Sequence, residues 1–163
     1  MGGYRWLSWR CNLRVNVMAF VVKGLEELKH NLNKFLIDTD KAVSVAIRKT
    51  AFAVDKHAKL AIRNPSIGTY VTRYREGGRP YSHVASKSGD APNTDTGRLI
   101  NSIAIKFTTG DHVAHVFTNL EYGFFLETVH NRPFLVPALN AEIGSFKDRV
   151  TDAVKAQIKK AKQ

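Results

Sequence analysis

Two histidines three residues apart, His112 and His115, carry side chains suited to binding a metal ion. They fall in a run of β-branched and aromatic residues that predicts a strand, where residues three apart point to opposite faces. Their imidazoles therefore could not easily share an ion, because the ligands of one ion must converge. His57 and His130 stand alone in the sequence, and we interpret both as hydrogen-bonded parts of the scaffold. The histidines predict no metal site and no cofactor.

Acid–base or nuclease chemistry requires carboxylates that converge, and the candidate acids here are dispersed without a recognised spacing. We interpret Asp95 as a helix cap. Glu127, five residues before Arg132, is interpreted as an ion-pair partner or as a group that faces another subunit. Cys11 has no identifiable base beside it. The sequence therefore predicts no catalytic residue. The acids considered are Asp90, Asp95, Asp111, Glu121 and Glu127.

Residues 64–93 mix arginines and tyrosines with glycines and prolines, without a sustained hydrophobic period. We predict a long basic loop, and loops beyond about 12–15 residues are usually functional or disordered. Interleaved cations and rings suit single-stranded nucleic acid, but Arg and Tyr are also enriched at protein interfaces. We favour a subunit contact. The residues concerned are Tyr70, Arg73, Tyr74, Arg75, Arg79 and Tyr81.

Two helical patterns precede this loop. Leucines at three- and four-residue spacings predict an amphipathic helix from Gly24 to about Leu36. The acidic cluster 38–40 predicts the N-cap of a second helix, which ends before Asn64. We expect these two helices to form an antiparallel pair.

The segments after the loop predict a mixture of helix and strand. We expect a short helical turn at 98–101, a hairpin over 102–118 with its turn at 108–111, a short helix over 121–127, and a long amphipathic helix from about Pro137 to Lys160. The predicted fold class is α+β. A small antiparallel sheet packs against two N-terminal helices and a long C-terminal helix, with the long basic loop between.

Composition indicates one domain with a real core, because 44% of the 163 residues are hydrophobic. The 25 Lys and Arg against 14 Asp and Glu give a formal charge of +11, which favours polyanions or acidic protein surfaces. A single cysteine excludes an internal disulfide and suits a reducing cytoplasm. The apolar stretch 15–22 is far short of the ~20 residues that span a bilayer, so no membrane partner is expected.

Residues 1–17 are set apart from the domain expected at 18–163. They show no clear period, and Met18 begins a short strand-like run. They are interpreted as a flexible leader, or as a segment upstream of the true start. The alternative is an arm whose Trp6 and Trp9 anchor on a neighbouring subunit, because amphipathic rings are favoured at interfaces.

Four segments in order carry a family resemblance: 24–28 (GLEEL), 95–103 (DTGRLINSI), 122–127 (YGFFLE) and 132–139 (RPFLVPAL). Together with the alanine-rich second helix, their order resembles the tail-completion, or head-to-tail joining, proteins of long-tailed double-stranded DNA bacteriophages. The resemblance covers about residues 19–160. It implies an α+β domain whose motif has an apolar core at Leu99, Ile103, Tyr122, Phe125, Leu126, Phe134, Leu135 and Leu139.

The resemblance also implies a function without catalysis. Subunits would form a ring, expected to be a hexamer, at the head-proximal end of the tail, where it ends tail-tube growth and joins the tail to the head. The implied partners are further copies of the chain, the tail-tube protein and head-side connector or neck proteins, with possible contact to passing DNA. The protein would reside in the virion after assembly in the host cytoplasm. A cyclic ring buries unlike patches of adjacent subunits. The interface is expected at Trp6, Trp9, Tyr70, Arg73, Tyr74, Arg75, Arg79, Tyr81, Glu127 and Arg132.

Two other function classes remain open at this point. The charge and the arginine–tyrosine loop also suit a small basic nucleic-acid-binding module of phage or prophage origin. A basic ribonuclease of toxin type fits the size but lacks a convincing catalytic set. Within the preferred class, a tail terminator and an adjacent neck layer are both compatible with the sequence.

Overall fold

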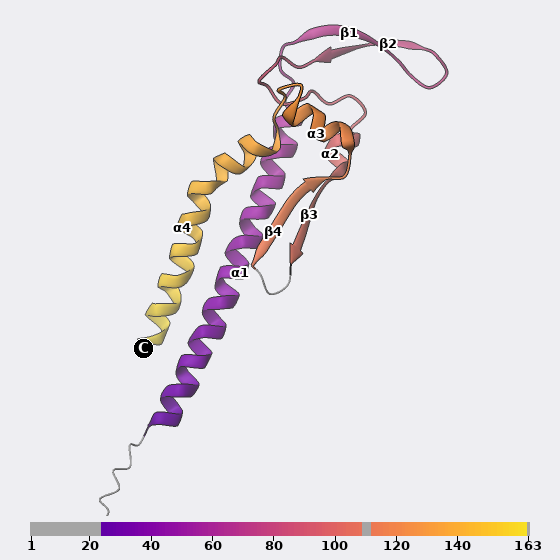
Figure 1. Cartoon of the computed structure of the whole chain (residues 1–163). Coiled ribbons are helices and arrows are strands. Elements are labelled where there is room, and N and C mark those ends of the chain that lie inside the picture. Colours follow the sequence, from indigo (N-terminus) through magenta and orange to yellow (C-terminus); the bar gives the residue numbers. More distant parts are fainter. Residues whose placement is uncertain (1–23, 109–111, 163) are drawn as a thin grey trace, which may run out of the picture.

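The computed structural model describes residues 24–108 and 112–162 and has an α+β fold, as the sequence predicts (Figure 1). The expected arm with Trp6 and Trp9, the strand-like run at 18–23, Cys11 and residues 109–111 lie outside the described residues. In chain order the elements are α1 (Leu25–Arg63), β1 (Thr69–Tyr74), β2 (Pro80–Ala85), α2 (Arg98–Ser102), β3 (Ile103–Thr108), β4 (Val113–Thr118), α3 (Glu121–Thr128) and α4 (Leu135–Ala161).

The expected pair of N-terminal helices is one continuous helix, so that part of the prediction is wrong. α1 has 39 residues, which corresponds to about 60 Å at 1.5 Å per residue. Residues 25–63 contain no glycine or proline. Nothing therefore ends a first helix before the 38–40 cluster, and the helix continues through it. The antiparallel partner of α1 is instead α4, which lies alongside it (Figure 1). α1 extends past the C-terminal end of α4 (Figure 1).

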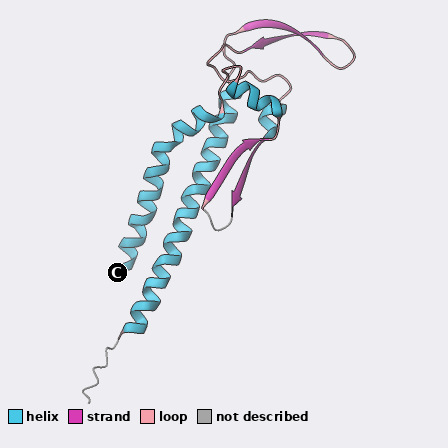
Figure 2. Ribbon diagram, in the orientation of Figure 1, coloured by secondary structure: helices cyan, strands magenta, loops and turns pink. Residues whose placement is uncertain are grey.

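The expected loop 64–93 contains a β-hairpin, a second correction. β1 and β2 pair antiparallel from Thr69↔Ala85 to Tyr74↔Pro80, and the tight turn between them carries Gly77 at φ 91°. The hairpin projects beyond the end of α1, and most of β1 is exposed on both faces (Figures 1 and 2). A strand that buries neither face has no need of apolar alternation, which explains why the sequence pattern did not predict it.

The second hairpin, β3 and β4, confirms the prediction for residues 102–118. Its register runs from Ile103↔Thr118 to Thr108↔Val113. The hairpin packs along α1, which lies between it and α4 in the view of Figure 1. The predicted helices at 98–101, 121–127 and 137–160 are present as α2, α3 and α4.

The hydrophobic core lies where the C-terminal half of α1 meets α2, β3 and the start of α4. Its most enclosed large side chains are Ile62 and Phe134, each 1% exposed. Leu99 and Ile103 are also buried, while Leu126 and Leu135 pack at the edge. The cluster comprises Val54, Ala58, Ile62, Leu99, Ile100, Ile103, Phe134 and Ala138.

Three residues expected in the core lie on the surface of the chain. Tyr122 is 42% exposed, and Phe125 and Leu139 are each 50% exposed. Helical spacing places them on apolar faces, but within the described residues no element covers the outer sides of α3 and of the first turns of α4. These positions are corrected from core to exposed apolar surface.

A polar cluster fixes α4 against α1. Glu142 of α4 is 6% exposed and lies 2.9 Å from Arg149 Nη1 and 3.5 Å from His57 Nε2. Arg149 Nη1 also donates a hydrogen bond to Thr50 Oγ1 at 3.0 Å. A buried carboxylate is tolerated only when cations or donors compensate its lost hydration, so this cluster favours one axial register of the two helices.

Candidate functional site

The six residues of the expected basic loop all lie on the β1–β2 hairpin or its turn. Tyr70 and Tyr74, four apart on β1, share one face and are 77% and 71% exposed. Arg73 pairs with Tyr81 in the strand register. The hairpin therefore presents two exposed rings on one face, while Arg73 and Tyr81 on the other face contact Asp95.

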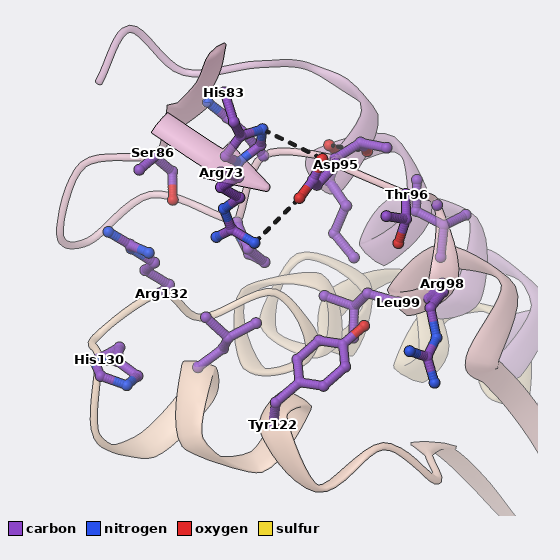
Figure 3. Close-up of a pocket in the computed structure, with 18 of the residues that line it drawn as sticks. Arg73, His83, Ser86, Asp95, Thr96, Arg98, Leu99, Tyr122, His130 and Arg132 are labelled. Carbon is purple, nitrogen blue, oxygen red and sulfur yellow. Dashed lines mark hydrogen bonds and ion pairs between the residues drawn. The ribbon is translucent and has the colours of Figure 1, made fainter. Parts of the chain in front are cut away.

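Asp95 ties that other face to the domain. Tyr81 donates its hydroxyl proton to Asp95 at 2.8 Å, and Arg73 Nη1 lies 3.1 Å from the same carboxylate (Figure 3). His83 Nδ1 is 3.9 Å away. The hydrogen bond to Asp95, together with partial burial and the carboxylate charge, raises the pKa of Tyr81 above its usual 10.0. Arg73 and Tyr81 thus serve first to hold the hairpin in place.

The interpretation of Asp95 as a helix cap is wrong. The residue before α2 is Gly97 at φ 76°, and no side chain caps that helix. Asp95 instead accepts donors from a hairpin more than ten residues earlier in the chain. A carboxylate two residues before a helical pattern resembles a cap in sequence, and only the folded arrangement brings Arg73 and Tyr81 to it.

Asn93 holds the base of the hairpin, a role that the sequence patterns do not predict. Its Oδ1 accepts a hydrogen bond from the Ser66 N–H at 2.8 Å, and its Nδ2 donates to the carbonyls of Ser66 and Val84 at 2.9 Å each. Gly68 lies so close to the Ala85 carbonyl that an added Cβ would be 1.6 Å from that oxygen. In the sequence, the only local sign of these contacts is an asparagine within a segment rich in glycine and proline.

Glu127 closes the connection between α3 and α4. Its carboxylate accepts hydrogen bonds from the backbone N–H groups of Phe134, Leu135 and Val136 at 2.8, 3.2 and 2.9 Å. Donors at a helix N-terminus have no partner within the helix, so the carboxylate caps α4. The expected ion pair with Arg132 is absent from the contacts of the described residues.

Arg132 lines a cavity of about 980 Å³ between the hairpin, the segment that follows it, α2 and α3. Arg73, Arg98, His83 and His130 also contribute to this cavity, with Asp95 as its one carboxylate (Figure 3). Four of the expected interface residues, Arg73, Tyr74, Tyr81 and Arg132, thus meet at one cavity. Arg75 stacks instead on Tyr81, 5.1 Å from the ring centroid, and Arg79 lies in the hairpin turn.

Large apolar side chains remain exposed along the helices. On the first turns of α1, Leu25, Leu28, Leu32 and Leu36 are 49–63% exposed. On α3, Phe124 is 63% exposed beside the half-exposed Phe125. Large exposed apolar patches are often interaction sites, so these helix faces are candidates for contact with another chain.

Of the two histidines considered as metal ligands, His112 is hydrogen-bonded to side chains of α1. His112 precedes β4, and its ring nitrogens lie 2.6 Å from Asp40 Oδ1 and 2.8 Å from Ser44 Oγ on α1. Across residues 24–108 and 112–162, no group of three His, Cys, Asp or Glu could hold a metal ion. None of the described helices is long and apolar enough to cross a membrane.

Comparison with known proteins identifies one family. The model of the HK97-gp10-like family, described as "Bacteriophage HK97-gp10, putative tail-component", matches residues 26–128. The match covers most of α1, both hairpins, α2 and α3. No curated protein and no solved structure matches the chain.

Proposed function

We propose, from the premise that this chain belongs to the HK97-gp10-like family of bacteriophage tail components, that its copies form a ring at the head-proximal end of the tail. Membership of the family makes the chain a structural tail component and implies a place in the virion. The ring is the finer part of the proposal. It would end growth of the tail tube and join the tail to the head.

The observation that supports self-assembly is the apolar surface left on the chain. Leu28, Leu32 and Leu36 form one exposed stripe near the start of α1, and α3 exposes Phe124 and Phe125. The start of α1 and α3 lie far apart along the molecule (Figure 1). A head-to-tail ring needs two unlike patches on each subunit. The two ends of this elongated chain offer such patches.

The β1–β2 hairpin is the second element that supports the ring. It reaches away from the helices and carries exposed Tyr70 and Tyr74 on one face. Tyrosine is a frequent anchor in interfaces because it buries a large ring while keeping a polar end. Since Asn93 and Asp95 fix its base, the hairpin can be inserted against a neighbour at little cost in conformational entropy.

Electron microscopy of phage particles that lack this protein tests the proposal. We expect tails of irregular length and full heads without attached tails. Light scattering of the purified protein, alone and with tail tubes, should show association that does not require DNA. Normal tails joined to full heads in the absence of the protein would overturn the proposal.

The alternative, a small nucleic-acid-binding module, gives a different result in solution. Such a protein would remain monomeric and bind a short duplex with an affinity that falls steeply with salt, because cations displace counterions from phosphates. The net charge of +11 favours this alternative, because a basic protein attracts nucleic acid.

A further inference from the structure

The cavity beneath the β1–β2 hairpin contains hydrogen-bonding groups that nothing in the described chain uses. Ser86, 4% exposed, has a buried Oγ without a partner, and Arg132 has a buried Nε without a partner. Both line the same cavity, and Figure 3 shows them on one side of it. Buried polar groups are nearly always hydrogen-bonded, so two unpaired groups in one cavity point to a ligand.

The charged groups that line the cavity favour a negatively charged ligand. Arg73, Arg98 and Arg132 line it together with the single carboxylate of Asp95. Asp95 is already neutralised by Arg73 and hydrogen-bonded by Tyr81. Neither Arg98 nor Arg132 forms an ion pair within the described residues. Two guanidinium groups are therefore free for an anion, and Arg binds carboxylates and phosphates through paired hydrogen bonds.

The rest of the lining favours a protein ligand over duplex nucleic acid. Tyr122, Phe125 and Leu126 of α3 form an apolar wall beside the cations. Duplex phosphates lie on a convex surface, whereas this lining is concave. A single strand, whose bases stack on aromatic rings, is the competing ligand that the test includes. Mixed apolar and cationic lining suits a peptide that carries carboxylates next to an apolar side chain.

We propose that this cavity binds an acidic segment of a partner protein, with a carboxylate on Arg132 and Ser86 and an apolar side chain on the α3 wall. The inference rests on the proposed role in tail assembly, where the chain meets other proteins. The segment is assigned to a different protein rather than to a second copy, because this chain has 25 Lys and Arg against 14 Asp and Glu and contains a single adjacent acidic pair, Glu26–Glu27.

Binding of a fluorescein-labelled Glu-Glu-Tyr-Glu-Glu peptide to the full chain, followed by fluorescence anisotropy, tests the inference. Arg132→Gln should weaken binding about tenfold or more, because a hydrogen bond to a charged group is lost. Ser86→Ala changes no charge and should still weaken binding several-fold. The matched control Lys155→Gln removes one charge from the exposed side of α4 and should change affinity less than about twofold.

Further comparisons separate the possible failures. Arg132→Lys keeps the charge without Nε and should bind more weakly than the parent chain, and thermal melting establishes that each variant is folded. Equal losses for Arg132→Gln and Lys155→Gln, or no loss for Ser86→Ala, would show only diffuse charge attraction and overturn the inference. A short DNA, single-stranded or duplex, or inorganic phosphate whose binding is weakened by Arg132→Gln but not by Lys155→Gln would overturn it in favour of a nucleic-acid or phosphate site. Either result leaves the ring proposal intact, because that proposal is tested by particle assembly.

Discussion

At the scale of single residues, the two carboxylates with the most suggestive sequence positions have exchanged their expected roles. Asp95, expected to cap a helix, instead binds Arg73 and Tyr81 of the hairpin. Glu127, expected to pair with a cation or a subunit, caps α4. Both acids use their acceptor capacity within the chain, which argues for structural rather than catalytic roles.

The cap formed by Glu127 should be measurable. Glu127→Ala removes the acceptor for three N–H groups at the start of α4, and we expect the free energy of unfolding to fall by about 1–3 kcal/mol. Urea denaturation measures the change. Asp152→Ala, on the exposed side of the same helix, is the control and should stay within about 0.5 kcal/mol. Equal stabilities for the two variants would contradict the capping role.

The contact between Tyr81 and Asp95 predicts a dependence on alkaline pH. Because the pKa of Tyr81 is raised in the folded chain, the folded state holds this proton more tightly than the unfolded state. The corresponding stabilisation is complete below the unfolded pKa and is lost as the pH rises through the folded pKa. Urea denaturation at each pH should therefore show the parent chain losing more stability than Tyr81→Phe as the pH rises above about 10. Parallel pH profiles would show that the hydrogen bond does not stabilise the fold.

At the scale of elements, the hairpin is defined by how closely its base packs. Gly68 faces the Ala85 carbonyl at a distance that excludes a Cβ atom, and Asn93 joins the two sides of the base through three hydrogen bonds. The β1–β2 hairpin is therefore an ordered part of the domain, although most of its surface is exposed. Its direction follows from these contacts rather than from a core of its own.

A pair of glycine substitutions tests this packing. Gly68→Ala should destabilise the chain by about 1–3 kcal/mol, or detach the hairpin locally, because the new methyl group would overlap a backbone oxygen. Gly144→Ala in α4 meets no atom within 4 Å and should raise stability by about 0.5–1 kcal/mol through helix propensity. Thermal melting and backbone NMR of β1 and β2 measure both effects. An unchanged hairpin in Gly68→Ala would show that its base is loosely packed.

At the scale of the whole molecule, the chain is elongated, with its core at one end of α1 and apolar surface along much of its length. A 39-residue helix packed on a shorter one leaves the first turns of α1 without a partner among residues 24–108 and 112–162. Neighbouring subunits would supply that partner in the proposed ring. The stability of the assembled protein would then depend on subunit concentration.

The exposed stripe of α1 provides the test at this scale. The double variant Leu28→Gln, Leu32→Gln should fold normally, since both side chains are more than half exposed and glutamine favours helix. Its association in light scattering and its ability to join heads to tails should fall sharply. The control double variant Asn31→Gln, Asn33→Gln places the same residue type on the same helix and should assemble as the parent does. If the leucine variant assembles with the same yield as the parent chain, this stripe is not part of the subunit interface.

The sequence by itself determined the α+β class, the second hairpin and the three helices that follow the basic segment. Each of these elements buries one face, so its apolar residues recur with the period of a strand or of a helix. It also indicated the family, whose model matches residues 26–128 and so includes segments 95–103 and 122–127. Contacts remote in sequence decided the rest. The antiparallel partner of α1 is α4, at the other end of the sequence, rather than a second N-terminal helix. The first hairpin buries too little to leave a pattern, and its position depends on Asn93 and Asp95. The cavity with Ser86 and Arg132 exists only where the hairpin, α2 and α3 meet, because its residues come from segments with no common period along the chain.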